Sequence, residues 1–124
     1  MKSTILKSTI LKGLLTILSI FLIQYINNPV FGQSSQISKT IEVSGNCKMC
    51  KKQIEKAGKI KGVTDINWDI KSHLLTISYD SLKTSIDKIQ LRIAAVGYDT
   101  PLFKANEETY NKLHMCCQYP RKKE

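Results

Sequence analysis

The segment Gly45-Asn-Cys-Lys-Met-Cys50 contains two thiols that are separated by two residues. Before it, residues 37–43 (ISKTIEV) place Ile37, Ile41 and Val43 on one face, as in a half-buried strand. After it, residues 48–60 carry apolar side chains at helical spacing. The thiols therefore lie where a strand leads into the first turn of a helix, and the free N–H groups and dipole there favour the thiolate.

Periodicity predicts the order of the remaining elements. In chain order these are strands at 63–70 and 74–79, a helix at 85–96, a strand at 99–103 and a short helix at 107–115 capped by Asn106. The core order is βαββαβ, which favours the α+β class. Two helices on one face of a four-stranded antiparallel sheet form the ferredoxin-like sandwich. Trp68 alternates with apolar neighbours and is predicted in the core. His73 is expected in a solvated turn, at the sheet end opposite the two thiols.

The N-terminal residues 1–32 have the three-part pattern of a secretory signal peptide. Lysines at positions 2, 7 and 12 precede the apolar run 14–23, and Gly32 supplies a small residue for cleavage. The run is shorter than the ~20 residues that span a bilayer, which favours cleavage over an uncleaved membrane anchor. We expect one domain at 33–104, followed at 105–124 by a C-terminal helix and a basic tail that contains Cys, in a protein that is periplasmic or secreted.

Charge and motif content narrow the function classes. The formal net charge is +9, and removal of the three leader lysines lowers it to +6. These charges are scattered, and an exported protein meets little nucleic acid, so nucleic-acid binding is not predicted. The sequence shows no Ser/His/Asp set, paired carboxylates or phosphate loop, so we predict a monomeric protein that is not an enzyme.

Residues 45–98 resemble the heavy-metal-associated (HMA) domain, the family of soluble copper chaperones, copper-ATPase metal-binding modules and the periplasmic mercury-scavenging protein. The resemblance rests on the strand–Cys-x-x-C–helix start and on the pair Gly97-Tyr98 after the second helix. It implies that Cys47 and Cys50 are thiolate ligands and that Tyr98 packs beside the metal loop. It also implies a metal-accepting protein as a partner.

The donor chemistry favours the same class of function. Cu(I) prefers soft thiolates and accepts only two of them, as does Hg(II), whereas a structural Zn(II) site needs four ligands. We therefore expect a protein that captures or transfers Cu(I), with Hg(II) as the chemically similar ion. The alternative is a secreted dithiol protein, either redox-active or stabilised by disulfides, because four Cys in an oxidising compartment suggest disulfides.

The tail carries a second group of donors, His114-Met-Cys-Cys117. The predicted last strand carries the chain about 16 Å away from the metal loop at ~3.3 Å per residue. The following helix returns it by about 14 Å at ~1.5 Å per residue. Cys116 and Cys117 are thus candidates, with His114, for extra ligands that would admit Zn(II) or a small Cu(I) cluster. Disulfide formation by these two Cys is the open alternative.

Overall fold

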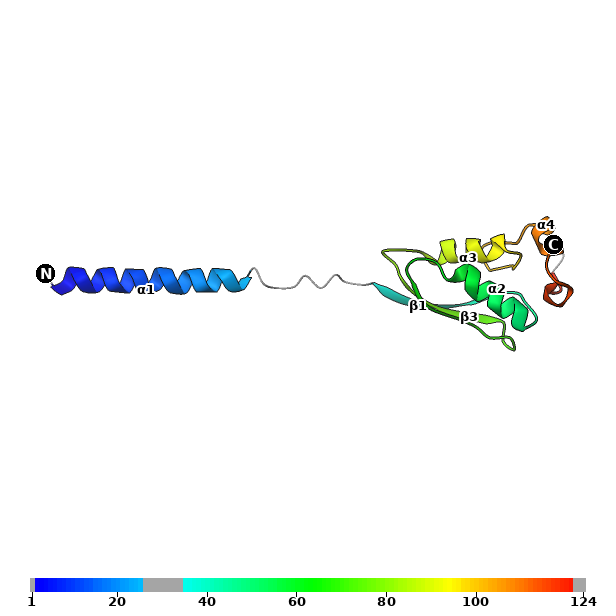
Figure 1. Cartoon of the computed structure of the whole chain (residues 1–124), viewed down its shortest axis with the longest axis horizontal. Coiled ribbons are helices and arrows are strands. Elements are labelled where there is room, and N and C mark those ends of the chain that lie inside the picture. The colour runs from blue at the N-terminus through cyan, green and yellow to red at the C-terminus, as the bar shows by residue number, and fades with distance from the viewer. Residues whose placement is uncertain (1, 26–34, 122–124) are drawn as a thin grey trace. The chain divides into compact units, whose positions relative to one another are not determined.

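The computed structural model describes residues 2–25 and 35–121 of the 124-residue chain (Figure 1). The chain divides into two compact units, Met1–Gln33 and Ser34–Glu124. The first contains helix α1 (Lys2–Tyr25). Among the described residues, no helix has the length and apolar character needed to cross a bilayer. The cleavage site expected at Gly32 lies outside the described residues.

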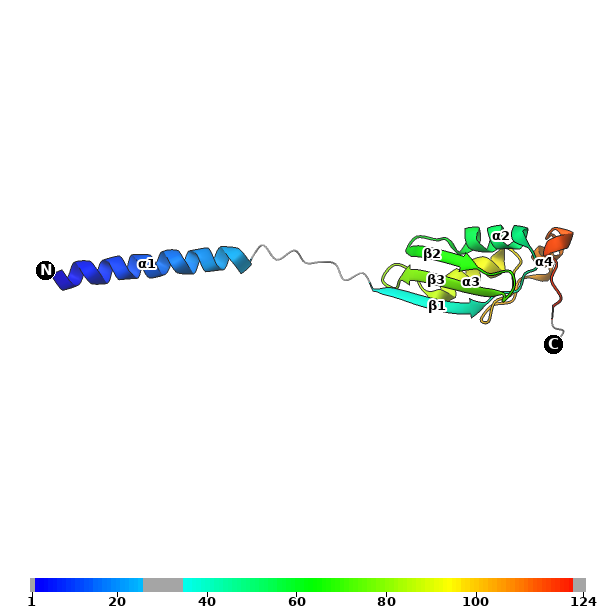
Figure 2. The same cartoon turned by 90° about the horizontal axis from the view of Figure 1, so that it is seen from below.

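The second unit is an α+β domain built on one antiparallel sheet. Its elements are β1 (Gln36–Glu42), α2 (Lys48–Gly58), β2 (Val63–Trp68), β3 (Leu74–Asp80), α3 (Ile86–Ala95), α4 (Glu107–Asn111) and a 3₁₀ turn at Met115–Cys117. The sheet has three strands in the order β1-β3-β2, and α2 and α3 pack over it (Figure 2). The tail folds as part of this unit.

The buried core lies between the two helices and the sheet. Apolar stripes of both helices supply Ile54, Ile89 and Ile93, all fully buried. The N-cap of helix α3 is Ser85, whose side chain accepts a hydrogen bond from the Lys88 N–H. Periodicity in the sequence therefore located both core helices.

The predicted fourth strand at residues 99–103 is wrong. This segment forms a turn in which the Thr100 N–H donates to the Phe103 carbonyl (2.9 Å) and the Phe103 N–H donates to Thr100 Oγ1 (3.1 Å). The Ser44 N–H donates to the Asp99 carbonyl (3.1 Å), but Ser44 lies just beyond the end of β1. Pro101 has no N–H to donate to a ladder, and the Thr100 hydroxyl competes for the backbone. The described part of the chain is therefore a ferredoxin-like sandwich without its last strand.

The C-terminal helix is shorter than predicted, and this changes the path of the tail. Asn106 caps α4 as expected, with Oδ1 accepting from the Glu108 N–H (2.8 Å). The helix ends at Asn111, and the Leu113 N–H bonds to the Tyr110 carbonyl (3.0 Å) in a closing turn. The chain then reaches the 3₁₀ turn, so the tail returns through a turn rather than through a helix to residue 115.

His73 lies at the sheet end that carries the metal loop, so its predicted placement at the opposite end is wrong. Because β3 runs antiparallel to β1, the start of β3 lies beside the end of β1. The Val43 N–H accordingly donates to the His73 carbonyl (2.9 Å). The imidazole stacks on Trp68 with ring centroids 5.9 Å apart. Trp68 is fully buried, which confirms its predicted place in the core.

Candidate metal centre

The Cys-x-x-C pair lies at the start of α2, at the predicted strand-to-helix junction. Cys47 is the N-cap residue, with extended backbone dihedrals (φ −144°, ψ 175°) and a half-buried side chain. Cys50 is in the first turn and is fully buried. Their sulfurs are 3.4 Å apart, and the Asn46 N–H points to Cys50 Sγ at 3.4 Å.

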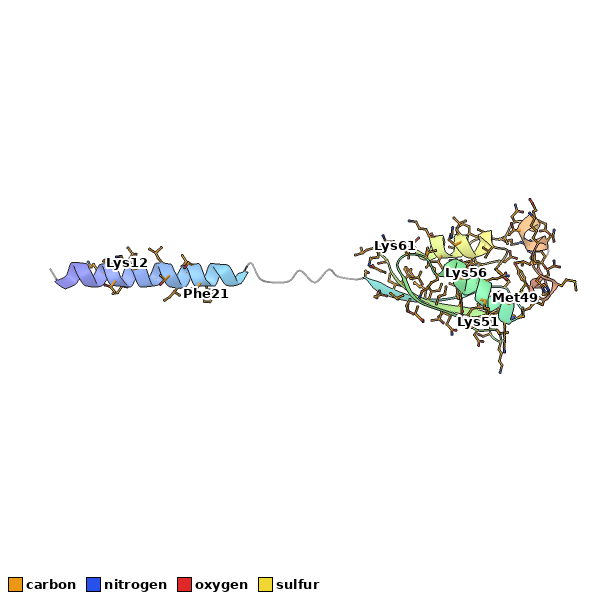
Figure 3. All side chains as sticks on the ribbon, viewed as in Figure 1. Lys12, Phe21, Met49, Lys51, Lys56 and Lys61 are labelled. Atoms are coloured by element: carbon orange, nitrogen blue, oxygen red, sulfur yellow. The ribbon has the colours of Figure 1, made fainter. Side chains whose placement is uncertain are left out.

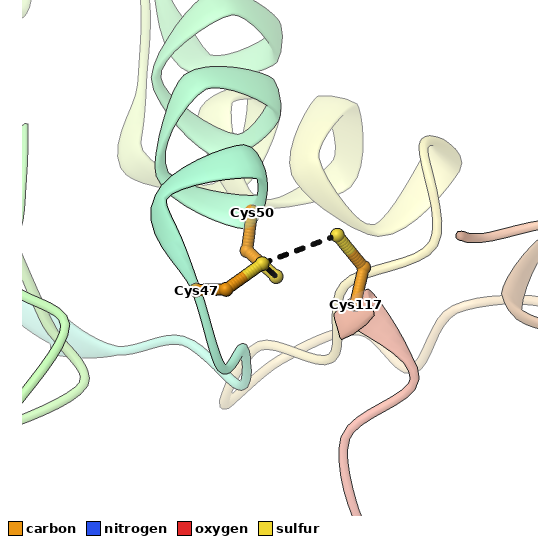
Figure 4. Close-up of side chains that lie close together, drawn as sticks. All are labelled: Cys47, Cys50 and Cys117. Atoms are coloured by element: carbon orange, nitrogen blue, oxygen red, sulfur yellow. Dashed lines mark hydrogen bonds between the residues drawn. The ribbon is translucent and has the colours of Figure 1, made fainter. Parts of the chain in front are cut away.

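The tail brings two more thiols to this pair. Cys47 Sγ lies 3.3 Å from Cys116 Sγ and 3.7 Å from Cys117 Sγ, and the two tail sulfurs are 3.9 Å apart. The sulfurs of Cys47, Cys50 and Cys117 all lie within 4.8 Å of one another, and Figure 4 shows the three side chains converging from α2 and from the C-terminal segment. All four Cys are free thiols. The two Cys clusters are thus one cluster in space.

His114 adds an imidazole on the outer side of this cluster. It caps the 3₁₀ turn, because its Nδ1 accepts from the Cys116 N–H at 3.4 Å. The same Nδ1 is 3.3 Å from Cys116 Sγ. Cys116 is exposed, whereas Cys117 is fully buried. The possible metal ligands therefore include buried thiols, Cys50 and Cys117, and an exposed thiol, Cys116.

A buried tyrosine fastens the tail to the domain. Tyr119 is only 2% exposed, and its hydroxyl donates to the Gly97 carbonyl (2.9 Å) while accepting from the Asp99 N–H (2.8 Å). The Tyr110 hydroxyl donates to the Tyr119 carbonyl (2.5 Å). These bonds hold the residue two positions beyond Cys117, so they also limit where that thiol can lie.

An arginine forms the second fastening. Arg121 makes a two-pronged ion pair with Asp99 (2.9 and 2.8 Å) and also donates to the Ala105 carbonyl (2.8 Å). It reaches Glu107 at 2.7 Å, and its guanidinium lies 4.9 Å above the Tyr110 ring. Sequence reasoning missed both fastenings. The available signal was Tyr119, two positions after the Cys pair, because a tyrosine side chain is more often at least partly buried than fully solvated.

Tyr98 lies beside the thiols, where the family resemblance places it. Its side chain is fully buried, its hydroxyl donates to Gln53 Oε1 (2.5 Å), and its ring stacks on Tyr119 at 6.2 Å. Burial, together with its interactions with the Cys117 and Cys50 thiols, raises the Tyr98 pKa well above its ordinary value. The hydroxyl therefore stays protonated at physiological pH.

The thiols differ strongly in acidity. Desolvation opposes ionisation of Cys47, but hydrogen bonds from the Cys50 backbone and from the Cys116 and Cys50 thiols lower its pKa to about 6. Burial, followed by interaction with Cys50, raises the pKa of Cys117, and a hydrogen bond to Cys47 raises that of Cys116. At neutral pH, Cys47 is thus the thiolate that these neighbouring thiols stabilise.

This difference predicts an order of alkylation in the reduced, metal-free protein. Because the Cys47 pKa is lowered to about 6, the rate of its reaction with iodoacetamide should rise between about pH 5 and pH 7. Cys116 is more exposed but should react only at higher pH, because its pKa is raised. Peptide mass spectrometry after timed alkylation measures both. Faster labelling of Cys116 than of Cys47 at pH 7 would contradict the assignment.

Positive charge accompanies the cluster without forming a single stripe. Lysines lie along α2 and in the loop after it, among them Lys51, Lys56 and Lys61 (Figure 3). Lys51 is engaged in the fold, since its Nζ contacts Glu55 (2.5 Å) and the Trp68 carbonyl (2.6 Å). The scattered charges match the solvated surface that the sequence predicts.

Comparison with known proteins places this geometry in a family. The model of the heavy-metal-associated domain matches residues 40–99. The water-soluble region of the P-type ATPase CopA from Bacillus subtilis is 35% identical, with a TM-score of 0.51; the match covers 54% of this chain and 46% of that one. Oxidized MerP from Ralstonia metallidurans CH34 is 26% identical, with a TM-score of 0.51, over 53% of this chain and 94% of that one.

A putative copper-ion-binding protein from Bacillus anthracis str. Ames shares the fold, with a TM-score of 0.52 at 24% identity, over 55% of this chain and 99% of that one. No curated protein sequence gives a significant match to this chain. The family match contains Cys47, Cys50 and Tyr98 and ends before the tail donors at residues 114–117. Through residues 40–99, this chain belongs to the heavy-metal-associated domain family.

Proposed function

We propose that this protein is an exported, non-enzymatic carrier of a soft metal ion, and that the ion is Cu(I). The observation that carries the proposal is the convergence of the Cys47, Cys50 and Cys117 sulfurs within 4.8 Å of one another. Cu(I) binds two or three thiolates readily, and Hg(II) has similar preferences. Zn(II) needs a closed four-ligand shell, so it would also have to recruit Cys116.

The site has the openness that a carrier needs. Cys50 and Cys117 are buried, but Cys47 is only half-buried and Cys116 is exposed. A thiolate of a metal-accepting protein can therefore approach the ion from the side of Cys47 and Cys116 and replace the ligands one at a time. Tyr98 is fully buried and packs beside the two buried thiols, Cys50 and Cys117. We propose transfer to such an acceptor as the purpose of the site.

Export is supported by the features of residues 1–32. Three lysines precede an apolar run, and α1 (Lys2–Tyr25) belongs to a compact unit separate from the metal-binding one. Cleavage near Gly32 would release residues 33–124 into a periplasm or outside the cell. Without cleavage, this segment would tether the protein at a membrane.

Metal analysis of the protein isolated from its native compartment tests the proposal. Purification under reducing conditions should yield a monomer that begins at Gln33 and contains copper in excess of zinc and mercury. In equilibrium competition, a chromophoric Cu(I) chelator should lose Cu(I) to the protein. A protein that leaves all the copper on the chelator, or that carries only zinc, would rule out the copper assignment.

A dithiol redox function is the second candidate, because four free thiols lie within 3.9 Å of a neighbouring sulfur and the Cys47 pKa is lowered to about 6. Low thiol pKa is typical of disulfide oxidoreductases. Insulin reduction by the pure protein separates the two functions. A rate above that of an equal concentration of dithiothreitol would favour the redox function.

A further inference from the structure

We infer that the four cysteines form a binuclear Cu(I) site, in which Cys47 and Cys117 bridge two ions while Cys50 and Cys116 each complete the shell of one. The inference rests on the proposed function and extends it from one ion to two. It assigns different roles to the four sulfurs, so each role can be tested separately. It also gives the tail, which lies outside the family match, a chemical purpose of its own.

The sulfurs form two triangles that share an edge. The inner triangle is Cys47, Cys50 and Cys117, whose sulfurs lie within 4.8 Å of one another. The outer triangle is Cys47, Cys116 and Cys117, with sulfur separations of 3.3, 3.7 and 3.9 Å. The shared edge is the 3.7 Å separation of Cys47 and Cys117. Each triangle offers three thiolates, which is a suitable shell for a trigonal Cu(I) ion.

A single tetrahedral ion fits this arrangement less well. At a metal–sulfur distance of ~2.3 Å, all six sulfur separations in a tetrahedron would be about 3.8 Å. Cys116 contacts Cys47 and Cys117 but is not in the mutually close group that contains Cys50. The sulfurs therefore form an elongated arrangement with Cys50 and Cys116 at its ends. Such an arrangement has room for two ions, one on each side of the shared edge.

The two triangles also differ in their surroundings. Cys50 and Cys117 are fully buried, and Tyr98 packs beside them, so the inner ion would be shielded from water. Cys116 is exposed, and His114 Nδ1 lies 3.3 Å from its sulfur. The imidazole is therefore close enough to bind the outer ion or to donate a hydrogen bond to the Cys116 thiolate. We expect the outer ion to be bound more weakly and exchanged first.

Charge balance favours a second monovalent ion. Four thiolates in one cluster repel one another, and one Cu(I) neutralises only one of the four charges. A second Cu(I) neutralises another without requiring new donors. The N-terminus of α2, where Cys47 is the cap residue, adds partial positive charge that stabilises the two negative charges left after both ions are bound.

The test is the Cu(I) stoichiometry of the reduced, full-length protein, measured by native mass spectrometry and by titration against a Cu(I) chelator. Wild-type protein should bind two Cu(I) per monomer, and X-ray absorption should show a short copper–copper vector. Cys116→Ser should bind one Cu(I) and lose that vector. Cys50→Ser should also retain one ion, held by the outer triangle with lower affinity.

Met115→Leu is the matched control, because Met115 is a soft donor between His114 and Cys116 but its side chain is 83% exposed. It should keep both ions. One Cu(I) in the wild type, two in Cys116→Ser, or copper shared between two chains would each overturn the binuclear site. No tight Cu(I) at all would instead reject the proposed function, so the two failures are distinguishable.

Discussion

Cys47→Ser is expected to weaken Cu(I) binding more than any other single substitution. Cys47 Sγ contacts the sulfurs of Cys50, Cys116 and Cys117 at 3.4, 3.3 and 3.7 Å, so it lies at the centre of the cluster. Serine keeps the shape but replaces a soft donor with a hard one. Loss of a partner that only orients a ligand typically costs about 10–100-fold in metal affinity, so loss of this ligand should cost more than about 100-fold.

Competition with a chromophoric Cu(I) chelator measures this loss. The fold should survive, because Cys47 is half-buried and lies at the N-cap of α2 rather than within the helix. Far-ultraviolet circular dichroism checks that point. Met49→Leu is the control, since Met49 is an exposed sulfur in the same turn and should not change the affinity. An affinity of Cys47→Ser within about threefold of wild type would remove Cys47 from the site.

Trp68→Ala is expected to destabilise the domain by about 3–5 kcal/mol, the range for removal of a large buried aromatic side chain. Trp68 is fully buried, and its Nε1 donates to the Val43 carbonyl (3.0 Å). It also supports the metal loop, because a Cβ added at Gly45 would lie 3.0 Å from the Trp68 ring. Loss of the indole therefore opens a cavity directly under the loop that leads to Cys47.

Chemical denaturation of both Trp68→Ala and Trp68→Phe separates the contributions. Phenylalanine keeps most of the apolar contact but leaves the Val43 carbonyl without its indole partner, which costs about 1–3 kcal/mol. The alanine variant should therefore be clearly the less stable of the two. If the alanine variant loses less than about 1 kcal/mol, the indole does not support the core as described.

The local features of the candidate site were predictable from sequence. The Cys-x-x-C pair lies between a strand and a helix whose periodicities span only a few residues on either side, and β1 and α2 form there. The caps at Ser85 and Asn106 depend on side chains that bond to N–H groups two or three residues away. Such signals are complete within a short window of sequence.

The segment 99–103 shows where local reasoning failed. It is short, and whether it becomes a strand depends on pairing with β1, more than fifty residues earlier in the chain. Pro101 and the Thr100 hydroxyl favour the turn that the structure contains. Likewise, the end of the sheet on which His73 lies follows from the antiparallel pairing of β1 with β3, and a turn sequence alone carries no such information.

Residue type and local spacing were enough to predict the two core helices, the first three strands, the Cys-x-x-C pair at a helix start and the soft character of the donors. Only the tertiary structure decided that the sheet keeps three strands and that Cys117 lies 3.7 Å from Cys47. The physical reason is that the tail is held by long-range contacts, namely the buried Tyr119 hydroxyl and the Arg121–Asp99 ion pair. Neither contact leaves a periodic signal in the sequence.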